Sequence, residues 1–353
     1  MPMYVLWERL WIICIKNNMN RFLTALVCLT LMTLSACSGV VDTEGVEEVV
    51  LELVPDVESF FADGSSSVTF SVLDGDADIT DEAVIRCVTT GENLDGNTFT
   101  TSQDGDYVFV ASSGNKVSPD VTLKAMFASR FERKVCVMEF TGQWCSQCPD
   151  GAKILNFLVS DTYKGKVHAL AFHNDDEFSL PVEQQLAAKF NVSGYPYYVT
   201  DMRADDSGEL RGNGCSDSIY KSLYETETFC GPSVTCSYDS ASGKITATAK
   251  VIAEKAMEFR LAAYVVEDKI VADQTLGTGS TDKNYPHRHV VRKMLSADYS
   301  GDRLGQIAAG GEVVKEYSFT ADSSWNLENV TVVILAIDAD GEVNNSASSK
   351  VKQ

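Results

Sequence analysis

The feature that most constrains this chain is a pair of cysteines with C-x-x-C spacing, Cys145 and Cys148. An apolar run, Val135–Phe140, leads into the pair, and a helical pattern of apolar residues leads out of it from Pro149. A strand that delivers two cysteines to the first turn of a helix exposes them to free N–H groups and partial positive charge, which stabilise a thiolate. The sequence therefore predicts a site for thiol–disulfide chemistry at Trp144–Pro149.

Length and charge limit what the rest of the chain can do. At 353 residues the chain is long enough for two or three domains. It has 29 basic and 50 acidic residues, for a net charge of −21. Because such a surface repels phosphate groups, we exclude nucleic acid as a partner. Gly277–Ser280 lacks the residues and setting of a phosphate-binding loop, and no cofactor is predicted.

The N-terminus has the layout of a secretory signal. A basic Arg21 is followed by the apolar segment Phe22–Leu34, which is too short to span a bilayer comfortably. Leu34–Cys37 reads Leu-Ser-Ala-Cys and resembles a bacterial lipobox, which implies cleavage before Cys37 and membrane attachment through lipid on that cysteine. An uncleaved anchor and an ordinary signal are the alternatives. The residues before Met19 do not fit a signal, so Met19 is a candidate start.

The remaining cysteines leave several pairings open. Of ten cysteines, seven remain after signal removal and lipidation, and an exported chain permits disulfides. An odd number leaves at least one free thiol. Cys215 and Cys230 could form a bridge, either could pair with Cys236, or all could stay thiols. The pairing of Cys87 stays open, and Cys136 lies in an apolar strand, where it is most simply a small buried residue.

The chain divides by its periodicity into five segments. We predict a signal with lipobox at 1–37, an acidic tether at 38–48, an immunoglobulin-like β-sandwich at 49–127, an α/β unit at 128–232 and a second β-sandwich at 233–353. Alternating strands separated by Asp-Gly turns define the two sandwiches. Strands that alternate with helical patterns define the α/β unit.

The α/β unit resembles the thioredoxin superfamily. The carrying residues are Trp144–Pro149, the segment Lys189–Pro196 that matches the family's stretch before its cis-proline, and Glu139, six residues before Cys145. The resemblance implies a cis Tyr195–Pro196 bond and a buried acid at Glu139. The predicted fold class is an α/β thioredoxin-like domain flanked by two all-β immunoglobulin-like sandwiches.

A narrower resemblance covers the middle and last segments of the chain. Glu139–Cys145, Tyr285–Arg292 and Val330–Ile337 are similar to stretches of the twenty-eight-kilodalton outer-membrane lipoprotein family of Bacteroidetes. This resemblance implies a lipid-anchored protein of the cell envelope at the outer membrane. The sequence does not say whether the periplasmic or the outer face carries it.

The resemblance implies a role for each residue of the site. Cys145 would be the attacking thiolate and Cys148 would resolve the mixed disulfide. Pro196 in cis would pack beside the pair and present backbone to a substrate chain. Glu139 would relay a proton to or from Cys148, and Trp144 would shield one side. The expected partners are thiols or disulfides of envelope proteins.

Other interpretations stay open beside this one. The two cysteines could form a permanent disulfide in a non-catalytic binding or adhesion protein, and the dipeptide Ser146–Gln147 does not distinguish an oxidant from a reductant. His287 and His289 are two apart on a predicted strand and would share a face, but no third ligand is evident and no metal site is predicted. His173 follows a strand, where a solvated loop is favoured over a place in the site.

Overall fold

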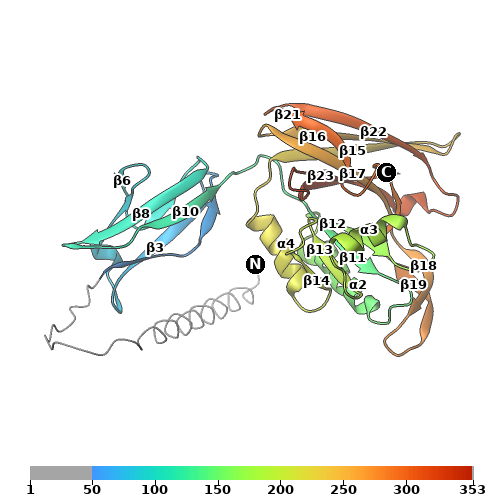
Figure 1. Ribbon diagram of the computed structural model, residues 1–353, viewed down its shortest axis with the longest axis horizontal. Coiled ribbons are helices and arrows are strands. Elements are labelled where there is room, and N and C mark those ends of the chain that lie inside the picture. The colour runs from blue at the N-terminus through green and yellow to red at the C-terminus, as the bar shows by residue number, and fades with distance from the viewer. Residues whose placement is uncertain (1–49, 352–353) are drawn as a thin grey trace, which may run out of the picture. The chain divides into compact units, whose positions relative to one another are not determined.

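The computed structural model describes residues 50–351, and Figure 1 shows the arrangement of its elements. The predicted signal, the predicted lipidation site Cys37 and the predicted acidic tether lie outside the described residues. Within the described part the chain is mostly β-strand and has three α-helices. None of its helices in that part is both long and apolar enough to cross a membrane.

The first part of the described chain forms two β-sheets around one core. Strand β3 shows why: Val68, Phe70 and Val72 alternate along it and are fully buried, and the Phe70 ring lies 4.8 Å from that of Phe109. The first sheet contains β1 (Glu52–Pro55), β3 (Ser67–Asp74), β4 (Ala77–Asp78) and β7 (Thr98–Thr100). The second contains β2 (Ser59–Phe61), β5 (Val84–Cys87), β6 (Glu92–Asn93), β8 (Gly105–Ser113), β9 (Lys116–Val117) and β10 (Val121–Met126).

A nine-stranded mixed sheet carries the cysteine pair. Its interior strand β11 (Val135–Thr141) is buried along its whole length and pairs in parallel with β12 (Val167–His173). Strand β12 in turn pairs in parallel with β20 (Val290–Met294) at Ala171 and Val290. The remaining strands are β13 (Tyr197–Thr200), β14 (Ser207–Glu209), β17 (Met257–Glu267), β21 (Asp302–Ile307), β23 (Val330–Ile337) and β24 (Val343–Lys350).

Strands β17 and β23 are apolar on both faces because both faces are covered. Val332 and Ile334 of β23 face one core, which is closed by a three-stranded sheet of β15 (Cys230–Asp239), β16 (Lys244–Ala253) and β22 (Glu312–Thr320). Val333 and Leu335 of the same strand face a second core, together with Phe140 of β11. A continuous apolar run such as 330–337 is typical of a strand buried on both sides.

The predicted fold class is wrong. The chain is predominantly β, and the strands around the cysteine pair are not a separate α/β thioredoxin-like domain between two immunoglobulin-like sandwiches. The parallel pairing of β12 with β20 joins them to strands beyond Pro232 in one sheet. Periodicity reports which face of a strand is buried, but it does not report which strand lies beside it, and this pairing spans more than a hundred residues.

Three helices and one hairpin complete this part of the fold. Helix α2 (Cys148–Phe157), followed by the π-helical turn Leu158–Thr162, and α4 (Gly214–Tyr224) share a core with β11 and β12 through Leu155, Ile219 and Leu223. Helix α3 (Pro181–Lys189) packs Val182 and Leu186 against the core that contains Phe140. The hairpin of β18 (Ile270–Thr275) and β19 (Thr281–His287) reaches the turn before α2.

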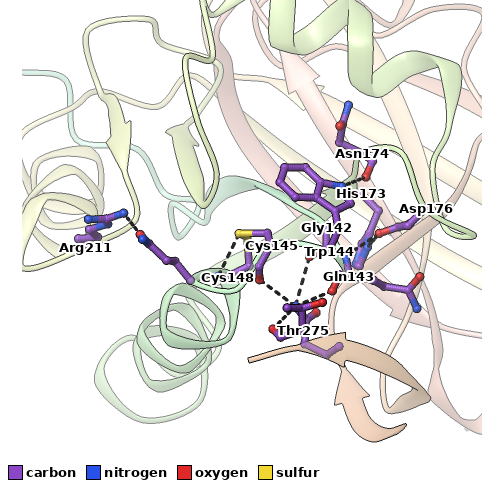
Figure 2. The surroundings of a disulfide bond; sticks show 12 residues. Gly142, Gln143, Trp144, Cys145, Cys148, His173, Asn174, Asp176, Arg211 and Thr275 are labelled. Carbon is purple, nitrogen blue, oxygen red and sulfur yellow. Dashed lines mark hydrogen bonds and ion pairs between the residues drawn. A yellow bond between two sulfur atoms is a disulfide. The ribbon is translucent and has the colours of Figure 1, made fainter. Parts of the chain in front are cut away.

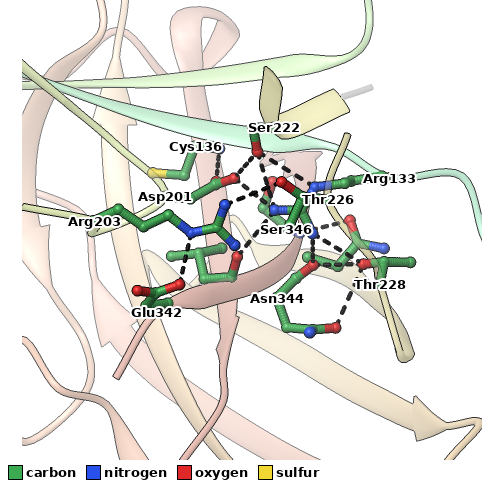
Figure 3. Close-up of polar contacts among 12 residues, drawn as sticks. Arg133, Cys136, Asp201, Arg203, Ser222, Thr226, Thr228, Glu342, Asn344 and Ser346 are labelled. Carbon is green, nitrogen blue, oxygen red and sulfur yellow. Dashed lines mark hydrogen bonds and ion pairs between the residues drawn. The ribbon is translucent and has the colours of Figure 1, made fainter. Parts of the chain in front are cut away.

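A buried polar network ties β11 to the C-terminal strand (Figure 3). The Arg133 Nη2 lies 2.8 Å from the Asp201 Oδ2, and the other carboxylate oxygen of Asp201 accepts the backbone N–H of Cys136 at 2.8 Å. Arg133 also donates to the Asn344 carbonyl, and Ser222 donates to Asp201. Both members of the ion pair are buried, so the network holds segments together that are far apart in the sequence.

Candidate active site

The cysteine pair lies between the end of β11 and the start of α2 (Figure 2). Cys145 and Cys148 form a disulfide with their Cα atoms 5.4 Å apart. The backbone N–H of Cys148 donates to the Cys145 sulfur at 3.1 Å. Pro149 occupies the first turn of the helix, where a missing N–H costs no hydrogen bond. The helix N-terminus therefore faces the sulfur of Cys145.

An open groove runs past the Cys145 side of the disulfide. We call it the outer groove; its volume is about 460 Å³. One wall is the turn from Trp144 to Gln147, and the opposite wall contains Tyr195, Pro196 and Arg211. A groove of this size accommodates several residues of an extended polypeptide, and Cys145 is the sulfur that borders it.

Pro196 packs directly against the helix that carries Cys148. The Tyr195–Pro196 bond is cis, as the resemblance implied. A Cβ atom at Gly151 would lie 2.7 Å from the Cγ of Pro196, so only glycine permits this approach. The sequence therefore places a small residue on α2 where the proline ring must fit.

Trp144 covers one end of the outer groove. Its indole Nε1 donates to the Asn174 carbonyl at 2.8 Å, and its ring packs edge-on against Tyr195 at 5.5 Å. The side chain stays 48 % exposed, so an apolar surface is available beside Cys145. Gly142 makes room for this indole, because a Cβ there would lie 2.8 Å from its Nε1.

A small, partly open cavity lies on the Cys148 side of the disulfide. We call it the inner cavity; its volume of about 20 Å³ has room for about one water molecule. Its walls come from β11, β12, α2 and the hairpin of β18 and β19. The lining includes Glu139, Cys148, His173, Tyr285, His287 and Arg288. The disulfide thus lies between the outer groove and a much smaller cavity lined by titratable side chains.

Glu139 is the acid of the inner cavity. It is buried, and its Oε1 has no hydrogen-bond partner among the described residues. Burial away from water raises the pKa of Glu139 to about 8, because the ionised form loses its hydration without gaining a cation. This carboxyl is therefore mostly protonated at neutral pH and can give up a proton.

The histidines lie differently from the sequence expectation. His173 is the last residue of β12 and is buried rather than solvated, with its Nδ1 2.7 Å from the Asp176 Oδ2. The ring of His287 lies 5.3 Å from that of His173, and burial lowers the pKa of His287 to about 4. His289 instead contacts Asn156 at 3.0 Å. His287 and His289 therefore point to different surroundings, and in residues 50–351 no group of three or more potential ligands gathers around a metal-sized site.

The other described cysteines are all thiols. Cys87, Cys136, Cys215 and Cys230 are buried, and Cys236 is partly buried. The pairings left open for Cys215, Cys230 and Cys236 are not made. Burial raises the pKa of Cys215 to about 12 and also raises that of Cys230, so neither is a ready nucleophile.

Sequence reasoning did not find the contribution of the hairpin. Gln274 of β18 donates to backbone carbonyls of the turn that carries Cys145, and Tyr285 and Arg288 line the inner cavity. In the sequence, the stretch Tyr285–Arg292 contributed to a family resemblance and offered two histidines, but nothing linked it to the cysteine pair. Nothing in a single glutamine within a strand signals that it reaches a site 129 residues earlier in the chain.

The comparisons with known proteins point to the cell envelope. The family model described as outer membrane protein Omp28 matches residues 183–353. The solved structure of HBP35 of Porphyromonas gingivalis has a TM-score of 0.54 at 21 % identity, and the match covers 64 % of this chain and 77 % of that one. The family match supports the outer-membrane localisation expected from the sequence, and the likeness to HBP35 concerns the fold.

Weaker structural similarities carry no argument. The sporulation control protein Spo0M of Bacillus subtilis has a TM-score of 0.24 at 13 % identity, with 34 % of this chain and 46 % of that chain covered. A DUF4785 family protein of Legionella pneumophila has a TM-score of 0.26 at 9 % identity, with 85 % and 55 % covered. None of the curated proteins matches this chain.

Proposed function

We propose that this outer-membrane protein exchanges thiols and disulfides with other proteins of the cell envelope through Cys145 and Cys148. The observation that carries the proposal is the position of the disulfide. Cys145 borders an open groove, and the N–H of Cys148 at the start of α2 lies 3.1 Å from its sulfur. A thiolate at Cys145 gains from this donor and from the helix N-terminus.

The exchange is balanced in two steps. A substrate thiolate attacks the Cys145 sulfur, the bond to Cys148 breaks, and Cys148 leaves as a thiolate while Cys145 holds the substrate in a mixed disulfide. A second substrate thiolate then attacks the substrate sulfur, which forms the substrate disulfide and releases Cys145 as a thiolate. Two electrons pass from the substrate to the protein, and the reverse sequence reduces a substrate disulfide.

Glu139 is suited to transfer a proton in the first step, from the side of the disulfide that faces the inner cavity. Cys148 and Glu139 both line the inner cavity, and the pKa of Glu139 near 8 keeps a proton on the carboxyl at neutral pH. That proton can pass to the Cys148 thiolate as it leaves, and it returns in the reverse direction. In the outer groove, Trp144 and Pro196 offer the apolar surface and the backbone edge that a substrate chain would contact.

The experiment is a redox titration of the purified protein. The protein is equilibrated with glutathione buffers of graded ratio, alkylated and weighed by mass spectrometry. We expect Cys145–Cys148 to titrate reversibly and a Cys148→Ser variant to trap mixed disulfides with envelope proteins. Cys236→Ser, which removes a thiol outside the site, should leave both results unchanged.

Two outcomes would oppose the exchange reaction. A potential below about −300 mV would mark the disulfide as structural. Failure of Cys148→Ser to capture any envelope protein would also count against exchange, and would favour a non-catalytic binding or adhesion protein in which the disulfide is permanent.

We also propose that lipid on Cys37 holds the protein at the membrane. The proposal rests on the Leu-Ser-Ala-Cys sequence that ends at Cys37. We expect Cys37→Ala to move the protein from the membrane fraction to the soluble fraction. Retention of that variant in membranes would mean that another part of the chain provides the attachment.

A further inference from the structure

The hairpin of β18 and β19 fastens the turn that carries Cys145. Gln274 is buried, and a β-bulge between Ala272 and Gln274 changes the register of β18 at that point. The Gln274 Nε2 lies 3.0 Å from the Cys145 carbonyl oxygen. It lies 3.3 Å, 3.1 Å and 3.1 Å from the carbonyl oxygens of Gly142, Gln143 and Thr275.

These contacts identify the donor without ambiguity. All four partners of the Gln274 Nε2 are backbone carbonyl oxygens, which only accept hydrogen bonds, so the amide nitrogen rather than its oxygen must face them. The amide has two hydrogens for four oxygens. The shortest of the four contacts is the one to Cys145.

The Cys145 carbonyl competes with the Cys145 sulfur for a second donor. The backbone N–H of Cys148 lies 3.3 Å from that carbonyl oxygen and 3.1 Å from the sulfur. One N–H shared by two acceptors binds each more weakly than it would bind one. A carbonyl that already accepts a hydrogen bond from Gln274 draws the Cys148 N–H less strongly.

We propose that Gln274 is a positioning residue for the Cys145 thiolate. By satisfying the Cys145 carbonyl, it leaves the Cys148 N–H to the sulfur, and by fastening the turn it holds that sulfur at the helix N-terminus. This role rests on the proposed exchange reaction, in which Cys145 is the thiolate. It assigns a function to a hairpin that lies 129 residues beyond the nucleophile.

The effect on reactivity follows from the charge on the sulfur. A hydrogen bond to a thiolate is stronger than one to a thiol, so weakening it raises the pKa of the Cys145 thiol in the reduced protein. Loss of a bond of this kind corresponds to a shift of about one pKa unit. The equilibrium constant between the dithiol and the disulfide then shifts toward the disulfide by up to about ten-fold, which is about 30 mV in reduction potential.

The first test replaces Gln274 with a side chain of similar length and no donor. Gln274→Met should fold, because Gly142, Gln143 and Cys145 each keep another backbone N–H at their carbonyl oxygens. The measurement is the rate of Cys145 alkylation against pH in chemically reduced protein, followed by peptide mass. We expect the midpoint to rise by about one unit. Gln185→Met, at an exposed position of α3, is the matched control.

A second variant keeps the shape of the Gln274 side chain but replaces its amide with a carboxyl group that can ionise. In Gln274→Glu the protonated carboxyl still donates one hydrogen bond, whereas the ionised form repels both the carbonyls and the thiolate. At acidic pH we expect the Cys145 alkylation rate of Gln274→Glu to be close to that of the wild type. At basic pH we expect it to be lower than that of Gln274→Met. Charged or titratable groups that share the inner cavity with this position in the reduced protein are Glu139, Cys148, His173, Tyr285, His287 and Arg288.

The outcomes separate this inference from the proposed function. Alkylation of reduced protein reports on Gln274 whether or not the protein exchanges disulfides with partners. If Gln274→Met and Gln274→Glu both keep the wild-type alkylation profile, the inference is wrong, even when the glutathione titration succeeds. If the profiles shift as expected but no exchange occurs with any envelope protein, the proposed function fails and the positioning role of Gln274 stands.

Discussion

Two buried carboxyl groups are associated with strand β11, and they differ in their partners: one is paired and hydrogen-bonded, and the other is not. Asp201 receives hydrogen bonds from Arg133, Ser222 and the backbone N–H of Cys136 on β11. Glu139, three residues after Cys136 on that strand, forms no ion pair among the described residues, and its Oε1 has no hydrogen-bond partner there. Burial is nearly complete for both.

The difference separates a structural acid from a chemical one. A buried charge that is paired and hydrogen-bonded holds segments together, and removing its partner is costly. A buried acid without such partners costs the fold free energy and has a raised pKa, a combination that clusters where protons are transferred. The Arg133–Asp201 pair thus supports the sheet, whereas Glu139 is the proton donor in the proposed exchange reaction.

The largest expected effect concerns the paired acid. Arg133→Met leaves Asp201 buried without its cation, and we expect the free energy of unfolding to fall by about 3–5 kcal/mol. Urea denaturation measures the change. Arg303→Met, which removes an exposed arginine paired with Glu258, should cost less than about 1 kcal/mol. Equal losses in the two variants would remove the distinction between the network and an ordinary surface pair.

The unpaired acid should respond with the opposite sign. The folded pKa of Glu139 is about 8 against an ordinary value of 4.5, so the folded protein binds the extra proton between these limits. The contribution of Glu139 to the free energy of unfolding is therefore fully present below pH 4.5 and is lost as the pH rises to about 8. We expect Glu139→Gln to abolish this loss and therefore to be more stable than the wild type at pH 8, by about 4 kcal/mol.

Urea midpoints at pH 5 and pH 8 test this expectation. Glu258→Gln, at an exposed position, should keep the pH dependence of the wild type. Asp201→Asn should destabilise the protein, because it removes the charge that faces Arg133. If Glu139→Gln were destabilising at pH 8, Glu139 would have to be counted with the structural acids.

The smallest effect is expected at the rim of the outer groove. Trp144→Ala removes the edge-on contact with Tyr195, which is worth about 1 kcal/mol, and exposes the Cys145 sulfur. We expect a loss of stability of that size and a faster reduction of the disulfide by dithiothreitol. Trp144→Phe keeps a ring against Tyr195 and should lie between the two. An unchanged rate of reduction in Trp144→Ala would show that the indole does not shield the disulfide.

The local parts of the site were predictable and the long-range parts were not. The motif around Cys145 and Cys148 indicated a strand that ends at a helix, and the resemblance implied the buried acid at Glu139 and the cis bond at Pro196. These depend on residues close in sequence or on a familiar segment. The pairing of Ala171 with Val290, which contradicts the predicted fold class, joins two strands that are far apart in the sequence and carry no local signal of their contact.

The hairpin illustrates the same limit at the level of one side chain. Gln274 is a polar residue buried in β18, and nothing in the composition of that strand sets it apart. Its proposed role follows only from the backbone carbonyls to which it donates hydrogen bonds. The run Val330–Ile337 is apolar except for Thr331, and the structure buries it on both faces. In the sequence, this run supported a family resemblance and was assigned to a β-sandwich, so the second layer that covers it was not predicted.

The position of the hairpin in the sequence makes the site depend on residues that are far apart along the chain. Cys145 and Cys148 precede residues 270–294, so the contacts of Gln274 with the turn and the pairing of β12 with β20 form only once those later residues have joined the fold. The surroundings of the disulfide are therefore complete only when the hairpin has packed against the turn that carries Cys145.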